Sequence, residues 1–187
     1  VKFTNAYATP VCSPTRVSLM TGMNAARHRV TNWTLQPDKP QPMELNHPTL
    51  AFPDWNYNGI GLEAATPNAA YAKPLPQLLS EKGYFTLHAG KAHFGAIGYP
   101  SSNPINLGFQ MNIAGHAAGA PESYLGRENF GNGKKGKEVW AVPGLEKYHG
   151  EDLFLTEVLS KEVRTALDEP VAKKQPFFLY FALYGIH

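Results

Sequence analysis

The chain has 187 residues, of which 43% are hydrophobic and 17% charged, and its formal net charge is +2. This composition is typical of a globular domain with its own core, and it favours neither a nucleic-acid-binding surface nor a polybasic membrane anchor. No segment approaches the roughly 18 apolar residues of a membrane-spanning helix, and the single cysteine, Cys12, excludes an internal disulfide framework.

Two helices and a strand are predicted in the first half of the chain. Ser13 as the N-cap and Pro14 at the first helical position predict a short helix that ends at Gly22. The spacing of the leucines predicts a second helix over 74–83, and the segment YFTLHAG (84–90) follows it as a buried strand.

A further helix and strand are predicted near the end of the chain. Asp152 predicts the start of a helix through Leu167, and the apolar run PFFLYFALYGI (176–186) is typical of a central strand covered on both faces. The inner face of this helix carries six apolar residues: Leu155, Val158, Leu159, Val163, Ala166 and Leu167. Residues 31–73 and 95–150 are predicted to form long loops. The order helix, strand, helix, strand predicts an α/β domain with a mainly parallel sheet.

Basic side chains follow both predicted strands. Lys91 and His93 come directly after the first strand, and His187 follows the second. Arg16 lies near the start of the first helix, where a cation opposes the helix dipole unless an anion binds there. Because ligands bind at the carboxyl ends of parallel strands, these four groups predict an anion site beside Cys12.

Two motifs in this region carry a family resemblance. Residues 12–16 (CSPTR), followed by Thr21 and Gly22, resemble the signature C-x-P-[S/T]-R…T-G of the type I sulfatases, which belong to the alkaline-phosphatase-like superfamily. Residues 90–95 (GKAHFG) resemble the second motif of that family, G-K-x-H-x-G, with Ala92 at a position that is usually aromatic. The last residues, FFLYFALYGIH, are similar to the family's strand that ends on a catalytic histidine.

The resemblance implies a fold and a place for this segment within it. The fold is the alkaline-phosphatase-like α/β sandwich, in which a mixed, mainly parallel sheet carries helices on both faces. Residues 1–187 would then be part of the large N-terminal catalytic domain. In that family the first metal-binding strand precedes the present residue 1, and the remaining metal ligands and the C-terminal subdomain follow residue 187. We therefore expect that this segment alone neither holds the metal nor turns over substrate.

The resemblance also implies a role for each motif residue. A formylglycine-generating maturation enzyme would oxidise Cys12 to formylglycine, which acts as the nucleophile and as one ligand of a divalent cation, usually Ca2+. Arg16 would hold the hydrated aldehyde, and Lys91 would bridge it to a sulfate oxygen. His93 would act as the base that regenerates the aldehyde. His187 would bind the ester near its leaving oxygen and would be a candidate general acid.

The substrate class and the location are implied by the resemblance alone. A sulfate monoester of a carbohydrate is the expected substrate, and export to the periplasm, the cell surface or the lysosome is the expected location. Two alternatives remain open: a phosphonate or phosphodiester hydrolase of the same superfamily, and a non-catalytic glycan-binding relative in which Cys12 stays a thiol.

Four further residues have two interpretations each. His116 lies in a loop rich in glycine and alanine, where it either lines the substrate pocket or is an ordinary loop residue. Trp33, Trp55 and Trp140 either stack on sugar rings or anchor the loops that carry them.

Overall fold

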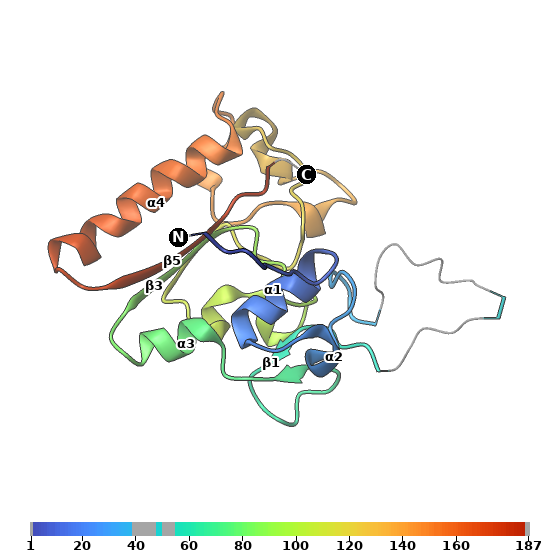
Figure 1. Cartoon of the computed structure of the whole chain (residues 1–187). Helices are drawn as coiled ribbons and strands as arrows, with labels where there is room; N and C mark the ends of the chain where they lie inside the picture. Colours follow the sequence, from blue (N-terminus) through green and yellow to red (C-terminus); the bar gives the residue numbers. More distant parts are fainter. Residues whose placement is uncertain (1, 39–47, 50–54, 186–187) are drawn as a thin grey trace.

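The computed structural model of the chain describes residues 2–38, 48–49 and 55–185. Its centre is a parallel three-stranded sheet in the order β4 (Met111–Ile113), β3 (Phe85–Gly90), β5 (Phe177–Ala182). A smaller parallel pair, β1 (Ile60–Gly61) and β2 (Ala70–Tyr71), lies apart from this sheet. The parallel α/β architecture agrees with the prediction from the sequence (Figure 1).

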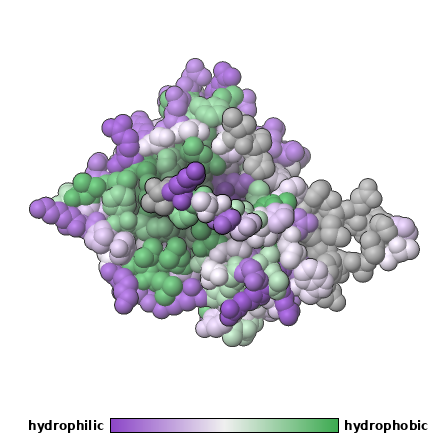
Figure 2. Space-filling view, in the orientation of Figure 1, coloured by the Kyte–Doolittle hydropathy of each residue, from purple (hydrophilic) through white to green (hydrophobic). Residues whose placement is uncertain are grey.

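The two predicted strands hold different positions in the sheet. The predicted strand at 84–90 is confirmed as β3, which lies in the centre of the sheet and is buried from Thr86 onward. The second strand is confirmed as β5, but it lies at an edge of the described sheet, and Phe177 and Phe181 are 42% and 38% exposed. Its prediction as a covered central strand is therefore wrong for the described residues. Figure 2 shows apolar side chains gathered on the surface around this strand.

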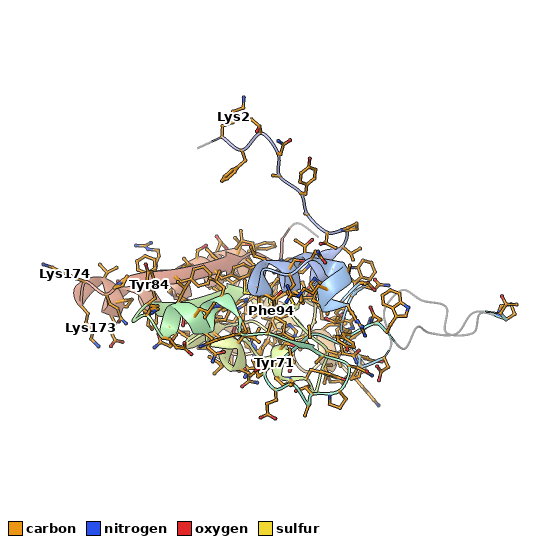
Figure 3. The ribbon with its side chains drawn as sticks, turned by 60° about the horizontal axis from the view of Figure 1, so that its bottom comes forward. Lys2, Tyr71, Tyr84, Phe94, Lys173 and Lys174 are labelled. Atoms are coloured by element: carbon orange, nitrogen blue, oxygen red, sulfur yellow. The ribbon has the colours of Figure 1, made fainter. Side chains whose placement is uncertain are left out.

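Helices cover both faces of the sheet. On one face lie α1 (Cys12–Thr21), α2 (Ala25–His28) and α3 (Leu75–Ser80). On the other face α4 (Leu155–Ala172) packs on β3 and β4. Each face has its own apolar cluster, and these include Val17, Met20, Phe94 and Phe109 on the first face, and Leu145, Leu155, Leu159 and Tyr184 on the second. In Figure 3 Phe94 lies within the body of the molecule, whereas Lys2 lies at the tip of an extended N-terminal segment.

The first helix begins two residues earlier than predicted. Cys12 is its first residue, and the N-cap is Val11, whose φ of 60° is unusual for a β-branched residue. Ser13 is therefore not the cap, because its buried hydroxyl accepts hydrogen bonds from the backbone N–H and the hydroxyl of Thr34. The predicted end is confirmed, since Gly22 caps the helix in the left-handed conformation at a φ of 70°.

The long helix α4 also differs from its prediction at both ends. Asp152 does not start it; the N-cap is Phe154, whose backbone N–H donates to the Glu157 carboxylate over 2.9 Å. The helix continues past Leu167 to Ala172 and includes Pro170. Of its predicted inner face, the first four residues are buried and Ala166 and Leu167 are half-buried.

The predicted loops contain short regular elements. Strand β4 and five 3-10 turns fall within 95–150: η1 (Pro100–Ser102), η2 (Pro104–Leu107), η3 (Gly126–Gly131), η4 (Glu138–Trp140) and η5 (Glu146–Tyr148). Strands β1 and β2 fall within 31–73. In the part of the chain that is described, no helix combines the length and the apolar character that crossing a membrane requires.

Candidate functional site

The site forms where the end of β3 meets the beginning of α1. Gly90 ends the strand with a φ of +88°, and a Cβ at this position would lie 2.1 Å from the carbonyl oxygen of Ala182 on β5. Only glycine permits this close approach, in which the next residue, Lys91, donates its backbone N–H to the same carbonyl over 2.7 Å. The chain therefore turns sharply out of the sheet at Lys91.

The side chain of Lys91 reaches the first residue of α1. Its Nζ donates to Sγ of Cys12 over 3.3 Å, although the two residues are far apart in the sequence. Lys91 is 3% exposed, and this burial lowers the pKa of its ammonium group, while the neighbouring Cys12 acts in the opposite direction. A buried cation therefore lies directly beside the thiol of Cys12, which is the single cysteine of the chain.

Arg16 connects the helix to the turn after β3. Its Nη1 donates to the backbone carbonyl of Lys91 over 2.7 Å and lies 3.4 Å from the hydroxyl oxygen of Tyr180 on β5. An arginine one turn into the helix therefore fixes the distance between Cys12 and the Lys91 backbone. The sequence around β5 does not predict this contact between the hydroxyl of Tyr180 and Arg16 of α1.

His93 lines the same cavity as Cys12 and has a constrained backbone position. Its φ is 53°, in the left-handed region that side chains other than glycine rarely adopt, and its N–H donates to the carbonyl of His116 over 3.1 Å. The residue is 4% exposed. A Cβ on Gly119 would lie 2.5 Å from Cε1 and Nδ1 of the His93 ring, so the glycine makes room for the ring.

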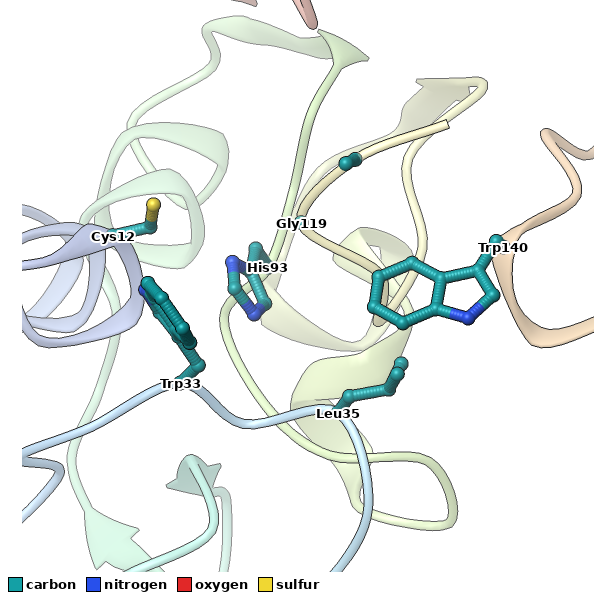
Figure 4. Close-up of a pocket in the computed structure, with 7 residues that line it drawn as sticks. Cys12, Trp33, Leu35, His93, Gly119 and Trp140 are labelled. Atoms are coloured by element: carbon teal, nitrogen blue, oxygen red, sulfur yellow. The ribbon is translucent and has the colours of Figure 1, made fainter. Parts of the chain in front are cut away.

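Cys12 and His93 share a cavity of about 180 Å3 whose other walls are apolar. Figure 4 shows the labelled residues around it: Cys12, Trp33, Leu35, His93, Gly119 and Trp140. Trp55 does not line this cavity and is 55% exposed. The two interpretations of the tryptophans thus separate, because Trp33 and Trp140 face the site and Trp55 does not.

Two other predicted site residues, His116 and His187, are not among the described residues that line the cavity. The ring of His116 packs against Tyr184, with 6.2 Å between the ring centroids, and burial lowers its pKa to about 4. Its ring is therefore neutral at pH 7, and it is not among the residues that line the cavity; its described link to the site is the backbone carbonyl that holds His93. His187 lies outside the described residues.

The described residues do not by themselves fit the Ca2+ that the resemblance implies. Within 2–38, 48–49 and 55–185, no group of three or more histidine, cysteine, aspartate or glutamate residues is placed to hold a metal ion. Calcium takes about six to eight oxygen ligands, whereas the thiol of Cys12 supplies none. The chemistry that can be derived from this chain is therefore that of Cys12, Arg16, Lys91 and His93.

Comparisons with known proteins show which family the chain resembles over its length. The Sulfatase family model matches residues 1–187. Arylsulfatase J of Mus musculus is 24% identical over 187 residues, which is 100% of this chain and 27% of that protein. N-acetylgalactosamine-6-sulfatase of Mus musculus is 26% identical over 191 residues, with 96% of this chain and 31% of that protein covered. The chain thus spans less than a third of the length of these relatives.

Solved structures support the fold. Ps i-CgsB matches with a TM-score of 0.60 and 26% identity over 95% of this chain and 35% of that chain. The same protein in complex with k-i-k-neocarrahexaose gives a TM-score of 0.59 at 25% identity, again over 95% and 35%. The PsFucS1 sulfatase from Pseudoalteromonas sp., at 19% identity and a TM-score of 0.51, shares the fold. The predicted alkaline-phosphatase-like α/β fold is confirmed.

Proposed function

The chain belongs to the sulfatase family, and on this premise we propose that it carries the reacting residue of a sulfuric ester hydrolase. One observation supports this most strongly: the ammonium group of Lys91 is buried and lies 3.3 Å from Sγ of Cys12. A buried cation beside a small side chain at a helix N-terminus is suited to stabilise negative charge that develops on that side chain and on an attached oxyanion.

We propose that a maturation enzyme oxidises Cys12 to formylglycine, whose hydrate has two hydroxyl groups on one carbon. One hydroxyl oxygen attacks sulfur, and the bond from sulfur to the alcohol oxygen breaks as that oxygen takes up a proton. The second hydroxyl then loses its proton, its oxygen re-forms the aldehyde, and the bond to sulfate breaks. Water hydrates the aldehyde again, so the net reaction converts a sulfate monoester and water into an alcohol and inorganic sulfate.

The neighbouring side chains fit the steps of this scheme. Lys91 would hold a sulfate oxygen and offset the charge of the transition state. His93, which shares the cavity with Cys12, would take the proton of the second hydroxyl. Arg16 would keep the helix N-terminus and the Lys91 backbone in register through its 2.7 Å hydrogen bond. The role of His187 as the general acid rests on the family resemblance.

The substrate that we propose is a sulfated carbohydrate. One relative is named N-acetylgalactosamine-6-sulfatase, and one structural neighbour was solved with k-i-k-neocarrahexaose. A location in the periplasm, outside the cell or in the lysosome fits such a substrate. Preference for a doubly charged phosphonate or for a phosphodiester over sulfate esters would instead favour the alternative activity of the superfamily.

The first experiment is peptide mass spectrometry across residues 1–27 of the protein isolated from its native host. We expect the mass of formylglycine at position 12, and we expect Cys12→Ala to abolish turnover of sulfate esters while the fold stays intact, because this half-exposed position contributes little to the core. An unmodified thiol in the matured protein, together with glycan binding without hydrolysis, would instead identify a glycan-binding relative.

A further inference from the structure

The walls of the cavity beside Cys12 come from two loops that are distant in the sequence. Trp33 lies in the segment after α2, and Trp140 is the last residue of η4. In Figure 4 the two indole rings lie on either side of His93, with Trp33 on the Cys12 side. Apart from Cys12 and His93, the residues that line the cavity have no polar side-chain group besides the indole N–H.

The first wall is attached directly to the reacting helix. Ser13, which follows Cys12, accepts hydrogen bonds from the backbone N–H and the hydroxyl of Thr34, over 3.3 and 3.1 Å. Thr34 follows Trp33 in the sequence. Two buried hydrogen bonds therefore join the residue next to Cys12 to the residue next to Trp33. On the next residue, the carbonyl of Leu35 accepts from the N–H of Ile97 over 3.0 Å. These hydrogen bonds therefore hold the backbone at Trp33 in a defined position relative to Cys12.

The second wall is held by its own backbone and by its ring. The N–H of Trp140 donates to the carbonyl of Lys137 over 2.9 Å, and its carbonyl accepts from the N–H of Glu122 over 2.9 Å. Its half-buried side chain packs against a small cluster of buried residues: Leu35, Ala117 and Ala118. The backbone at Trp33 and both the backbone and the ring of Trp140 are thus held without a ligand, which reduces the entropy that binding has to overcome.

Two indoles in the walls of one cavity favour one class of leaving group. The face of an indole is electron-rich and large, and it packs well against the flat side of another ring: the C–H face of a pyranose or the surface of an aryl group. A flexible acyclic chain presents no such face, and it loses conformational entropy when it is held in the cavity. The scarcity of polar groups in the walls also disfavours an alcohol whose hydroxyls point in every direction.

We infer that Trp33 and Trp140 form the subsite for the alcohol part of the ester and select a six-membered ring with a nonpolar face over an acyclic alkyl group. This inference rests on the proposed function, because it takes Cys12 to be the residue that reacts. The ring is either a pyranose or an aryl ring, since both have the same chemistry toward an indole face.

The test compares three sulfate esters on the matured protein: N-acetylgalactosamine 6-sulfate, 4-nitrophenyl sulfate and hexyl sulfate. The variants are Trp33→Leu and Trp140→Leu, which remove the flat face, and Trp33→Phe and Trp140→Phe, which keep an aromatic face. Trp55→Leu is the matched control outside the cavity. Each aromatic contact is worth about 0.5–1.5 kcal/mol, so we expect each Leu variant to lower kcat/KM for the preferred ring ester by about 2- to 12-fold.

The expected pattern separates ring selection from general damage. The Phe variants should retain most of kcat/KM for the ring ester, hexyl sulfate should change less than about twofold, and Trp55→Leu should behave as the parent. The ester that loses most identifies the source of the ring, sugar or aryl. An equal loss on hexyl sulfate, or no loss on either ring ester in both Leu variants, would overturn the inference. The use of both walls keeps the test decisive if one variant fails to fold.

A binding experiment distinguishes failure of this inference from failure of the proposed function. In Cys12→Ala no turnover occurs, and calorimetry can measure the affinity for the two ring esters with and without Trp33→Leu. A weaker affinity in the double variant supports the subsite even if the parent protein hydrolyses nothing. An unchanged affinity for both esters refutes the subsite even if the parent protein is an active sulfatase.

Discussion

A single methyl group can perturb the contact between Gly119 and the ring of His93 in the site. In Gly119→Ala the new Cβ would lie 2.5 Å from Cε1 and Nδ1 of that ring, whereas nonbonded carbon atoms pack at about 3.5–4.0 Å. The ring must therefore move by about 1 Å. Gly119 is not among the residues with a left-handed φ, so its backbone is available to alanine and the effect is confined to this clash.

The size of the expected effect follows from the displacement. A shift of about 1 Å in a catalytic group lowers the rate by about 10²-fold, which corresponds to about 2.7 kcal/mol of activation free energy. We expect kcat for a sulfate ester to fall by about two orders of magnitude in Gly119→Ala. KM should fall together with kcat, and kcat/KM should change little, because His93 acts in the proposed scheme on breakdown of the covalent intermediate, after the ester has bound and reacted.

The assay is steady-state kinetics of the matured protein together with its thermal midpoint. The matched control is Gly115→Ala in the same loop, where a Cβ would lie 2.5 Å from Cε1 and Nδ1 of His88, a ring that does not line the cavity. We expect this control to lower the thermal midpoint but to keep kcat within about tenfold. A wild-type kcat in folded Gly119→Ala would refute the positioning argument, and equal losses of kcat in both variants would attribute the effect to the loop as a whole.

Two further predictions concern buried side chains, one in the site and one in the central strand β3. Lys91→Met should lower kcat by about 10²-fold or more, because it removes the cation 3.3 Å from Cys12 Sγ; a change in KM alone would exclude Lys91 from the chemical step. Burial lowers the pKa of His88 from 6.5 to about 4, so the unfolded chain takes up a proton in this pH range that the folded chain does not. The free energy of unfolding should therefore fall by up to about 3 kcal/mol between pH 6.5 and 4 on account of this group, and His88→Phe should flatten that fall. Denaturant unfolding at several pH values measures both slopes, and identical slopes would contradict the prediction; the slope that remains should include His116, whose pKa burial also lowers.

Four of the five residues predicted at the site, Cys12, Arg16, Lys91 and His93, lie together there, and the fifth, His187, lies outside the described residues. Lys91 and His93 follow β3 and Cys12 begins α1, and the rule that ligand sites form at the carboxyl edge of a parallel sheet needs only the order of helices and strands. The cysteine and the two basic residues accordingly lie where the pattern predicts. The pattern does not reveal the contacts that orient these side chains.

The errors in the predicted elements have a common physical origin. Ser13 has the chemistry of a helix cap, but a residue distant in the sequence, Thr34, uses its hydroxyl, and the helix begins at Cys12 instead. Asp152 also has the chemistry of a cap, but the N–H of Leu155, the first residue of the helix, donates to the carbonyl of the distant Tyr124 over 2.8 Å. In both cases a competing hydrogen bond determines the outcome, and a local propensity carries no information about such a competitor.

The three tryptophans show the same limit of prediction from local sequence, here for the residues that line the cavity. Trp33, Trp55 and Trp140 have the same chemistry and all lie in predicted loops, so nothing local separates them. The fold separates them, because Trp33 and Trp140 line the cavity beside Cys12 and Trp55 does not. The residues that we propose to be catalytic could be named from short motifs, whereas the residues that line the cavity depend on loop paths that only the folded structure defines.

The turn after β3 is held from three directions, and this explains how two short motifs act as one site. The side chain of Arg16 in α1 donates to the carbonyl of Lys91, and the N–H of Lys91 donates to Ala182 in β5. The N–H of His93 donates to the carbonyl of His116 in the loop after β4. Because these bonds fix the backbone of the turn, the ammonium group and the imidazole are positioned before any ester arrives. A site positioned in this way loses little free energy to reorganisation in the transition state.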